Sequence, residues 1–369
     1  MENNRGCVLM AGGRGRRMGN MDKARLSFQN VPFGDRICQE AEKLGMPGYI
    51  STAAYPWEER PGWELVEDEI RDGQGQFIGP MGGLLSCLKR AREAGLDGLY
   101  TVPCDMPFFH KEQMRLLDLA PGEDGAVWRT RDGRIHPLCG YYRVSCIPCI
   151  EAMAERGEYR MRSLLEALSV RVQDTSGPHI PDRWFANINR IGDYGRLQEQ
   201  GAQPPVLAVC GGKNSGKTTL LIRLVERMSE VGIRCAVIKH DGHEFEADVP
   251  GTDSYRLKAA GAYGTAVYSG TRYSVVKEAA GSQCQDFFHC FGDGDIIFLE
   301  GQKYSHYPKL ELLRAGAAER PLADPAAVLA YVSDGFRPDP GLTGGRPVLD
   351  SEDLDQILET VLVFMDKSC

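Results

Sequence analysis

Two stretches of the chain carry residue types whose spacing suits phosphate chemistry, and the clearer one lies in the second half. Residues 211–218 fit the pattern G-x-x-x-x-G-K-[ST] in full. Glycines let the backbone curl so that successive N–H groups converge on phosphate oxygens at a helix start. Lys217 would neutralise the β- and γ-phosphates, and the Thr218 hydroxyl would complete a Mg²⁺ shell. The predicted nucleotide site consists of Gly211, Asn214, Ser215, Gly216, Lys217, Thr218 and Thr219.

Three more polar residues of the second half are predicted to face this loop. Glu300 ends the apolar run 296–299, so its carboxylate would stand at the end of a buried strand. At that position it can hold magnesium together with Thr218, or orient a water molecule. His240 follows another predicted strand, and ligands of parallel sheets bind at the carboxyl ends of the strands. His240 and Asp253 are additional candidates for this site. The alternative interpretation of His240 is a purely structural role.

The first half opens with a glycine-rich loop of a different kind. Residues 10–23 hold four glycines, three arginines and one lysine, yet they match no Walker pattern. A basic loop of this kind in a net-acidic chain favours a backbone wrapped around a triphosphate, with Arg17 and Lys23 supplying positive charge. A solvated basic turn is the alternative interpretation.

A carboxylate follows a later strand of the first half. Asp105 lies in Pro-Cys-Asp-Met-Pro at 103–107, directly after the apolar run 99–102. Alone it would be read as a turn former, but beside the glycine-rich loop it could hold Mg²⁺ between phosphate oxygens. The predicted chemistry is nucleotidyl transfer, in which an acceptor oxyanion attacks the α-phosphorus and pyrophosphate leaves. This reaction needs charge neutralisation by Arg17 and Lys23 and in-line positioning.

The elements that must position these residues alternate between strands and helices. In the first half the pattern predicts strands at 7–11, 49–53, 63–67 and 99–102, helices at 35–44 (with Asp35 as N-cap) and 84–94, and a hairpin of 127–130 with 135–142. In the second half it predicts strands at 206–210, 234–239 and 295–299 and helices at 218–231 and 354–365. The polar stretch 198–205, with its two prolines, separates the halves. We expect two tandem three-layer α/β domains: a Rossmann-like nucleotidyltransferase domain over 1–200 and a P-loop NTPase domain over 205–369.

Composition limits the remaining function classes. The 369 residues carry a net charge of −8, with 42% hydrophobic and 25% charged residues, which is typical of a globular protein and argues against nucleic acid or anionic membrane as partner. We find no apolar stretch of membrane-spanning length and no signal-peptide core, and therefore expect a cytoplasmic protein. We interpret the twelve cysteines as reduced thiols, and we do not expect Cys146 and Cys149 to form a zinc site.

Taken together, the first 200 residues resemble the molybdenum cofactor guanylyltransferase family. The resemblance rests on the opening loop 10–23 and on later motifs, which are Gly79-Pro80-Met81-Gly82-Gly83, Cys104-Asp105-Met106-Pro107, His136-Pro137 and Asn187-Ile188-Asn189. The second half looks like the GTP-binding companion protein of molybdopterin-guanine dinucleotide synthesis. Its marks are the loop 211–218, Ile238-Lys239-His240, Asp253-Ser254 and Leu299-Glu300-Gly301. The resemblance thus implies a fusion of two proteins of one pathway.

The resemblance implies a Mg²⁺-dependent transfer of GMP from GTP to molybdopterin or its molybdenum-loaded form, assisted by a GTP-binding domain that hydrolyses GTP weakly or only binds it. By motif position it places GTP against Met10, Ala11, Gly12, Gly13 and Lys23, with Asp68 near the nucleotide and Asp105 on the metal ion. Asn187 and Asn189 are further candidates. Met10 replaces the family's usual leucine, and 51–54 lacks the family's asparagine.

Several alternatives stay open. The Ala-Gly-Gly of 11–13 resembles the guanine-specific branch, whereas Met106 occurs among cytidylyltransferases, so we expect GTP with CTP as the alternative. A sugar-phosphate nucleotidyltransferase fused to a non-catalytic nucleotide-binding adaptor is the rival interpretation. The partners expected besides GTP and molybdopterin are molybdenum-insertion proteins, molybdoenzyme chaperones and a second copy of the chain, bound through the second half.

Overall fold

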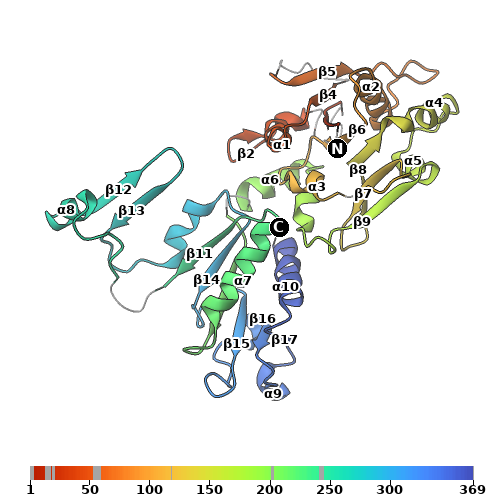
Figure 1. Ribbon diagram of the computed structural model, residues 1–369. Helices are drawn as coiled ribbons and strands as arrows, with labels where there is room; N and C mark the ends of the chain where they lie inside the picture. Colours follow the sequence, from red (N-terminus) through yellow and green to blue (C-terminus); the bar gives the residue numbers. More distant parts are fainter. Residues whose placement is uncertain are drawn as a thin grey trace. The chain divides into compact units, whose positions relative to one another are not determined.

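The computed structural model describes residues 4–12, 18, 21–52, 60–117, 119–200, 203–240 and 245–368, without the side chains of 199 and 200. The chain divides into two compact units (Figure 1). Unit 1 comprises Met1–Ala202, Glu226–Ile233 and Asp353–Cys369, and unit 2 comprises Gln203–Val225 and Arg234–Glu352. The linear division at 200–205 stays a prediction, since the contacts also group two later segments with unit 1.

Unit 1 is built on a seven-stranded sheet in the order β5-β4-β1-β6-β8-β7-β9. Its strands are β1 (Arg5–Met10), β4 (Gly48–Thr52), β5 (Trp63–Glu67), β6 (Gly98–Pro103), β7 (Gly125–Arg129), β8 (Ile135–Arg143) and β9 (Val170–Asp174). Strand β1 pairs in parallel with β4 on one side and β6 on the other, so the chain order reverses at β1. Ligands of α/β sheets bind at such a switch point, outside the carboxyl ends of the strands.

The helices of unit 1 connect these strands, and two short strands form a separate hairpin. The helices are η2 (Lys23–Arg25), α1 (Phe33–Glu42), α2 (Pro80–Glu93), α3 (Glu112–Arg115), η3 (Val144–Cys146), α4 (Ile147–Glu155), α5 (Met161–Ala167), η4 (Asp182–Phe185), α6 (Ile191–Gln200) and α10 (Leu354–Lys367). The hairpin consists of β2 (Ser27–Phe28) and β3 (Val31–Pro32). The expected N-cap role of Asp35 is wrong. Helix α1 begins at Phe33 after Pro32, whose fixed φ ends the preceding strand, and Asp35 instead pairs with Arg60 at 2.9 Å.

Unit 2 is built on a six-stranded, all-parallel sheet in the order β11-β14-β10-β15-β16-β17. Its strands are β10 (Val206–Gly211), β11 (Cys235–Lys239), β14 (Ile296–Glu300), β15 (Lys309–Leu313), β16 (Val328–Ser333) and β17 (Val348–Asp350). Around them lie α7 (Lys217–Glu230, which continues into unit 1), α8 (Asp253–Ala259), η5 (Cys284–Phe291), η6 (Pro325–Ala327), α9 (Pro340–Thr343) and the antiparallel pair β12 (Gly264–Tyr268) and β13 (Tyr273–Lys277). The expected α/β fold is confirmed in both halves.

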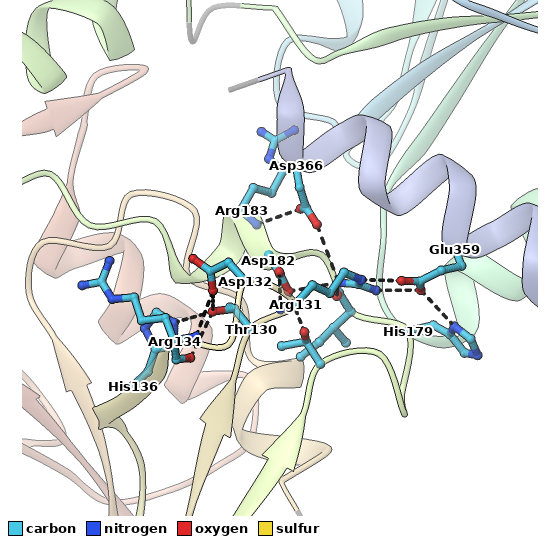
Figure 2. A network of polar contacts seen from close by, with 12 residues as sticks. Thr130, Arg131, Asp132, Arg134, His136, His179, Asp182, Arg183, Glu359 and Asp366 are labelled. Atoms are coloured by element: carbon cyan, nitrogen blue, oxygen red, sulfur yellow. Dashed lines mark hydrogen bonds and ion pairs between the residues drawn. The ribbon is translucent and has the colours of Figure 1, made fainter. Parts of the chain in front are cut away.

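Helix α10 is held in unit 1 by a half-buried arginine of the β7–β8 turn. Arg131 donates two hydrogen bonds to Glu359 of α10, at 2.6 and 2.9 Å, and a third to Asp182 at 3.0 Å (Figure 2). The N–H of Arg183 donates to Asp366 at 3.0 Å, near the end of the same helix. Bidentate arginine–carboxylate pairs hold both partners in one orientation. These contacts join α10 to the segment that leads into Asn187.

Among the described residues, no helix has both the length and the apolar composition needed to cross a bilayer.

Candidate nucleotide sites of the two units

Three predicted residues of unit 1 meet in one cluster, although they are far apart in the sequence. Lys23 begins η2, where the carboxylate of Asp22 caps the helix by accepting the N–H of Ala24 at 3.0 Å. The ammonium group of Lys23 lies 2.8 Å from Oδ2 of Asp105 and donates to Oδ1 of Asn189 at 2.9 Å. The cluster stands at the carboxyl ends of β1 and β6, beside the switch point. A cation and a carboxylate are therefore held together where a triphosphate would bind.

The environment of Asp105 leaves oxygen atoms available for a ligand. Asp105 is only 8% exposed, and its Oδ1 has no hydrogen-bond partner among the described residues. Its carbonyl oxygen accepts the N–H of Ile188 at 2.9 Å, which brings Asn187 and Asn189 to the end of β6. The buried Oδ1 of Asn187 likewise has no partner in the described part of the chain. Buried oxygen atoms are normally paired, so these two have free capacity for a hydrogen bond or for an ion.

A magnesium ion fits Asp105 on chemical grounds. Mg²⁺ prefers carboxylate oxygen and is commonly held by one or two carboxylates together with substrate phosphates. The described residues contain no group of three or more His, Cys, Asp or Glu side chains placed to hold a metal by themselves. Of the C-x-x-C pair, Cys146 donates its Sγ–H to the carbonyl of Asp124 at 3.3 Å.

The remaining residues predicted for unit 1 lie along the same sheet edge or outside the described residues. Met10 ends β1 and is followed by Ala11 and Gly12, at the end of the central strand. Gly13 and Arg17 fall outside the described residues, so their predicted roles stay predictions. Asp68 follows β5, three strands from β6, and is therefore not part of the Lys23 cluster.

Asp68 is held against the start of α2. It is 6% exposed, its Oδ1 accepts the N–H of Ile70 at 3.0 Å, and burial raises the pKa of its carboxyl group. The position that a Cβ of Gly82 would take lies 2.8 Å from the same oxygen. A glycine is thus needed there for α2 to approach the strand ends, which explains one residue of the Gly79–Gly83 motif.

In unit 2, the loop after β10 has the curled backbone that its sequence predicts. Gly211 lies so close to β15 that a Cβ would stand 2.6 Å from the carbonyl oxygen of Leu312, and Asn214 adopts a positive φ of 61°. Lys217 donates back to the carbonyl of Gly212 at 2.7 Å. Ser215 is buried, and its hydroxyl has no partner among the described residues. The lysine therefore rests on its own loop, within reach of incoming phosphates.

Thr218 and Glu300 meet beside this loop, as predicted for a magnesium site. The hydroxyl of Thr218 donates to Oε1 of Glu300 at 2.7 Å, and the ammonium group of Lys239 lies 4.0 Å from the same oxygen. Glu300 ends β14, which pairs directly with β10. A hydroxyl and a carboxylate are hard oxygen ligands, so Mg²⁺ fits this pair as well.

The other candidates of unit 2 show no contact with this pair in the described part of the chain. Thr219 and His240 are exposed, and His240 directly follows β11. Asp253 is in the first turn of α8, where it pairs with Arg256 at 3.5 Å and is 95% exposed. Their predicted roles stay predictions.

Two buried charged residues near the P-loop were missed at the sequence level. Lys309 and Glu311 are both fully buried in β15, the neighbour of β10. Lys309 donates to the carbonyl of Ser305 at 2.6 Å and so fixes the segment after Glu300. Glu311 accepts the N–H of Leu322 at 2.6 Å. Their alternation with leucines in Lys-Leu-Glu-Leu was the available signal, because charged residues rarely interrupt a buried strand.

Comparison with known proteins gives separate matches for the two halves. A model of the MobA-like NTP transferase domain matches residues 7–172, and a model of molybdopterin guanine dinucleotide synthesis protein B matches residues 206–334. The molybdenum cofactor guanylyltransferase of Cereibacter sphaeroides is 33% identical over 195 residues, which is 52% of this chain and 94% of the relative. The molybdopterin-guanine dinucleotide biosynthesis adapter protein of Escherichia coli (strain K12) is 35% identical over 170 residues, which is 44% of this chain and 94% of the relative.

Among solved structures, molybdopterin-guanine dinucleotide biosynthesis protein A from Archaeoglobus fulgidus is 20% identical, covering 53% of this chain and 97% of that one with a TM-score of 0.43. The expected fusion is confirmed by the two family matches. The chain belongs to the molybdenum cofactor guanylyltransferase family in its first half and to the molybdopterin-guanine dinucleotide biosynthesis adapter protein family in its second.

Proposed function

We propose that unit 1 transfers GMP from GTP to the terminal phosphate of molybdopterin, giving molybdopterin guanine dinucleotide and pyrophosphate. An acceptor phosphate oxygen forms the new bond to the α-phosphorus, and the bond from that phosphorus to the bridging oxygen of the β-phosphate breaks. The observation that carries the proposal is the Lys23–Asp105–Asn189 cluster at the carboxyl ends of β1 and β6. Family membership supplies the reaction class.

The residues of the cluster would divide the work as follows. Lys23 neutralises negative charge that develops on the phosphate oxygens, and Asn189 keeps its ammonium group in place through the 2.9 Å hydrogen bond. Asp105 would hold Mg²⁺, which when bound adds charge stabilisation at the phosphates. Arg17 is proposed as a second cation on the glycine-rich loop, and Asp68 as a residue near the nucleoside. Because Lys23, Asp105 and Asn189 are already in contact with one another, catalysis would rest on orientation and electrostatics.

The substitution Asp105→Asn tests this assignment. The amide keeps the shape of the side chain and can still accept from Lys23, but it removes the negative charge. We expect the initial rate of dinucleotide formation from α-labelled GTP to fall by about 100-fold or more. Asp97→Asn is the matched control, because Asp97 is exposed at the opposite end of β6. Equal rates in the two variants would rule out the proposed role of Asp105.

For unit 2 we propose that the loop Gly211–Thr218 binds GTP with Mg²⁺ shared by Thr218 and Glu300. The 2.7 Å contact between these two side chains supports the proposal. Loss of Lys217 in Lys217→Ala should weaken nucleotide binding by unit 2, whereas Lys277→Ala, a change on the exposed strand β13, should not. Release of γ-phosphate that Glu300→Gln abolishes would identify a GTPase; binding without release would identify a pure adaptor.

A second copy of the chain is proposed as a partner of unit 2, beside molybdenum-insertion proteins and molybdoenzyme chaperones. The β12–β13 hairpin carries large apolar side chains that are open to solvent, including Tyr268 (84% exposed) and Tyr273 (67% exposed). Apolar surface of this extent usually marks a contact surface. Sedimentation analysis should give a dimer for the native chain and a monomer for Tyr268→Ser; a monomeric native chain would exclude this partner.

A further inference from the structure

The segment 186–189 brings amide side chains to the candidate site of unit 1, and it follows η4 directly. Asn189 accepts from the ammonium group of Lys23 at 2.9 Å, and the N–H of Ile188 donates to the carbonyl of Asp105 at 2.9 Å. These two hydrogen bonds join the segment to both the cation and the aspartate of the cluster. The placement of the segment therefore depends on how η4 is held in unit 1.

Two aromatic side chains anchor η4 in the interior of unit 1. Trp184 and Phe185 are almost fully buried. The imidazole of His110 stacks on Trp184 with 4.6 Å between the ring centroids, and the ring of Trp128 meets Phe185 edge-on at 5.9 Å. These apolar contacts fix how deeply η4 lies. Because apolar burial is non-directional, the orientation of the polar first turn of η4 must come from hydrogen bonds.

The first turn of η4 is held by the last turn of α10, which also belongs to unit 1. Oδ1 of the half-buried Asp366 accepts the N–H of Arg183 at 3.0 Å, and Oδ2 lies 3.6 Å from Nη1 of Arg131 (Figure 2). The same Nη1 donates to Asp182, the first residue of η4, at 3.0 Å. Since an N–H in the first turn of a helix has no partner within that helix, the carboxylate of α10 supplies one.

Arg183 also contacts the segment that follows Asp105. Its guanidinium lies 4.6 Å from the centroid of the Phe108 ring, and Phe108 is three positions after Asp105. Such a cation–π contact attracts the two side chains to each other. In the other direction along the chain, Arg183 precedes Asn187 by four positions. The residue that Asp366 holds therefore adjoins both segments whose side chains meet in the cluster.

We propose that Asp366 is a positioning residue for guanylyl transfer: by accepting the N–H of Arg183 it orients η4, so that Asn189 keeps the ammonium group of Lys23 in place. This inference rests on the proposed function of unit 1 and adds a residue that acts through Asn189 rather than on the substrate. The last helix of the chain thereby takes part in the reaction of the first half. A displacement of about 1 Å in a catalytic group can cost about 100-fold in rate, so a residue without contact to the reacting atoms can still set the rate.

The test is Asp366→Leu in the full-length chain, because leucine keeps the branched shape of aspartate and accepts no hydrogen bond. Burial raises the pKa of the Asp366 carboxyl group to about 6, so the assays are run at pH 8, where the native side chain is ionised. We expect kcat for GMP transfer to fall by about 10-fold and KM for GTP to change by less than about 3-fold, since Lys23 acts on charge that develops in the transition state. Asp366→Asn keeps an acceptor for the N–H of Arg183 and should retain most of the activity.

A double-mutant cycle separates this positioning role from a general structural one. If Asp366 acts through Asn189, Asp366→Leu should slow the Asn189→Ala variant no further, whereas a general loss of structure would slow both backgrounds by the same factor. Lys367→Ala is the matched control, because Lys367 is exposed on the same turn of α10 and its loss should leave kcat unchanged. Equal factors in the two backgrounds, or an unchanged kcat in Asp366→Leu, would overturn the proposal.

Hydrogen–deuterium exchange tests the same contact without a transfer assay. Asp366→Leu should speed exchange at the N–H of Ile188, which joins the segment to Asp105, and leave α2 as protected as in the native chain. Unchanged exchange at Ile188 would overturn the inference. Absence of GMP transfer by the native chain would instead overturn the proposed function of unit 1, so the two failures are distinguishable.

Discussion

Lys23 and Asp105 compensate each other's charge across 2.8 Å, each side chain being less than one-fifth exposed. A lysine that is held by a carboxylate and an amide points in one direction before substrate arrives, so little side-chain order must be gained on binding. The same pairing leaves Oδ1 of Asp105 without a partner among the described residues. The cluster therefore forms without nucleotide, and Oδ1 of Asp105 remains available to a ligand.

Replacing Lys23 by methionine keeps the length of the side chain and removes its charge. Unit 1 of Lys23→Met should still fold, but GMP transfer should slow by about 100-fold or more, since the phosphates lose a positioned cation. Arg25→Met, on the exposed side of the same 3₁₀ helix, is the control. Initial rates at saturating GTP measure the effect, and a rate loss shared equally by both variants would speak against a specific role of Lys23.

His136 gives a pH dependence of stability whose sign is fixed by burial. The imidazole is 8% exposed, and burial lowers its pKa to about 4. The unfolded chain, with an ordinary histidine pKa near 6.5, binds a proton that the folded chain does not, so the stabilisation is present above pH 6.5 and is lost as the pH falls toward 4. His136→Gln removes this dependence while its amide can still reach Thr130, which lies 3.1 Å from Nε2.

Chemical denaturation of both proteins at pH 7.5 and 5.5 measures the effect. The unfolding free energy of the native chain, relative to that of His136→Gln, should fall by about 1 kcal/mol between the two pH values. All other titrating groups cancel in this difference. A constant difference, or one that grows on acidification, would contradict the buried neutral state of His136.

At the scale of elements, the start of α2 shows why glycines are needed where this helix meets the ends of the strands. Gly82 and Gly83 let the helix approach Asp68 and Ser51 so closely that any side chain would overlap with them. Close approach brings the helix N-terminus to the same edge as the carboxyl ends of β1 and β4, where its free N–H groups favour negative charge. Packing and electrostatics at this edge thus depend on the same residues.

Gly82→Ala should destabilise unit 1 by about 1–3 kcal/mol, because the new methyl group would lie 2.8 Å from both Asp68 and Ile78. Gly192→Ala in α6 is the matched control: nothing lies within 4 Å of its Cβ position, so helix propensity should raise stability slightly. Thermal unfolding followed by circular dichroism compares them. Equal melting temperatures would show that α2 does not pack as closely as described.

Local patterns predicted the elements better than they predicted contacts between them. The strand–loop–helix unit of β10, the P-loop and α7 was predictable because glycine spacing and an apolar strand are local signals, and β5 was predicted at its observed bounds. The hydrogen bond from Lys23 to Asn189 was not, because it joins residues 166 positions apart and depends on how the segment after η4 returns to β6. The burial of Lys309 was not predicted either, because it also depends on contacts between distant parts of the chain.

At the scale of the whole molecule, Arg131 links the end of the chain to unit 1. Its side chain is 15% exposed, and its guanidinium bridges Glu359 on α10 and Asp182 on η4 (Figure 2). Removing one partner from such a bridge leaves the others with unpaired charge, which costs more than an exposed pair would. This arrangement of α10 could not be predicted, because charge spacing does not reveal which distant carboxylates share one arginine.

Arg131→Ala should therefore release α10. We expect faster hydrogen–deuterium exchange in Leu354–Lys367 and around Asp182, with the rest of unit 1 unchanged. Arg129→Ala is the control: Arg129 lies two residues before Arg131 in the sequence, and it forms only an exposed pair with Asp174. Exchange in α10 that is the same in both variants would show that Arg131 does not hold the helix.

The most direct test of the central claim is a transfer assay with the native full-length chain. The protein is incubated with Mg²⁺, molybdopterin and each α-labelled nucleoside triphosphate in turn, and labelled pterin dinucleotide is separated and counted. We predict label in the dinucleotide with GTP and equimolar release of pyrophosphate. Label from CTP alone would contradict the assignment of the base, and absence of labelled dinucleotide with every nucleotide would contradict the proposed guanylyl transfer itself.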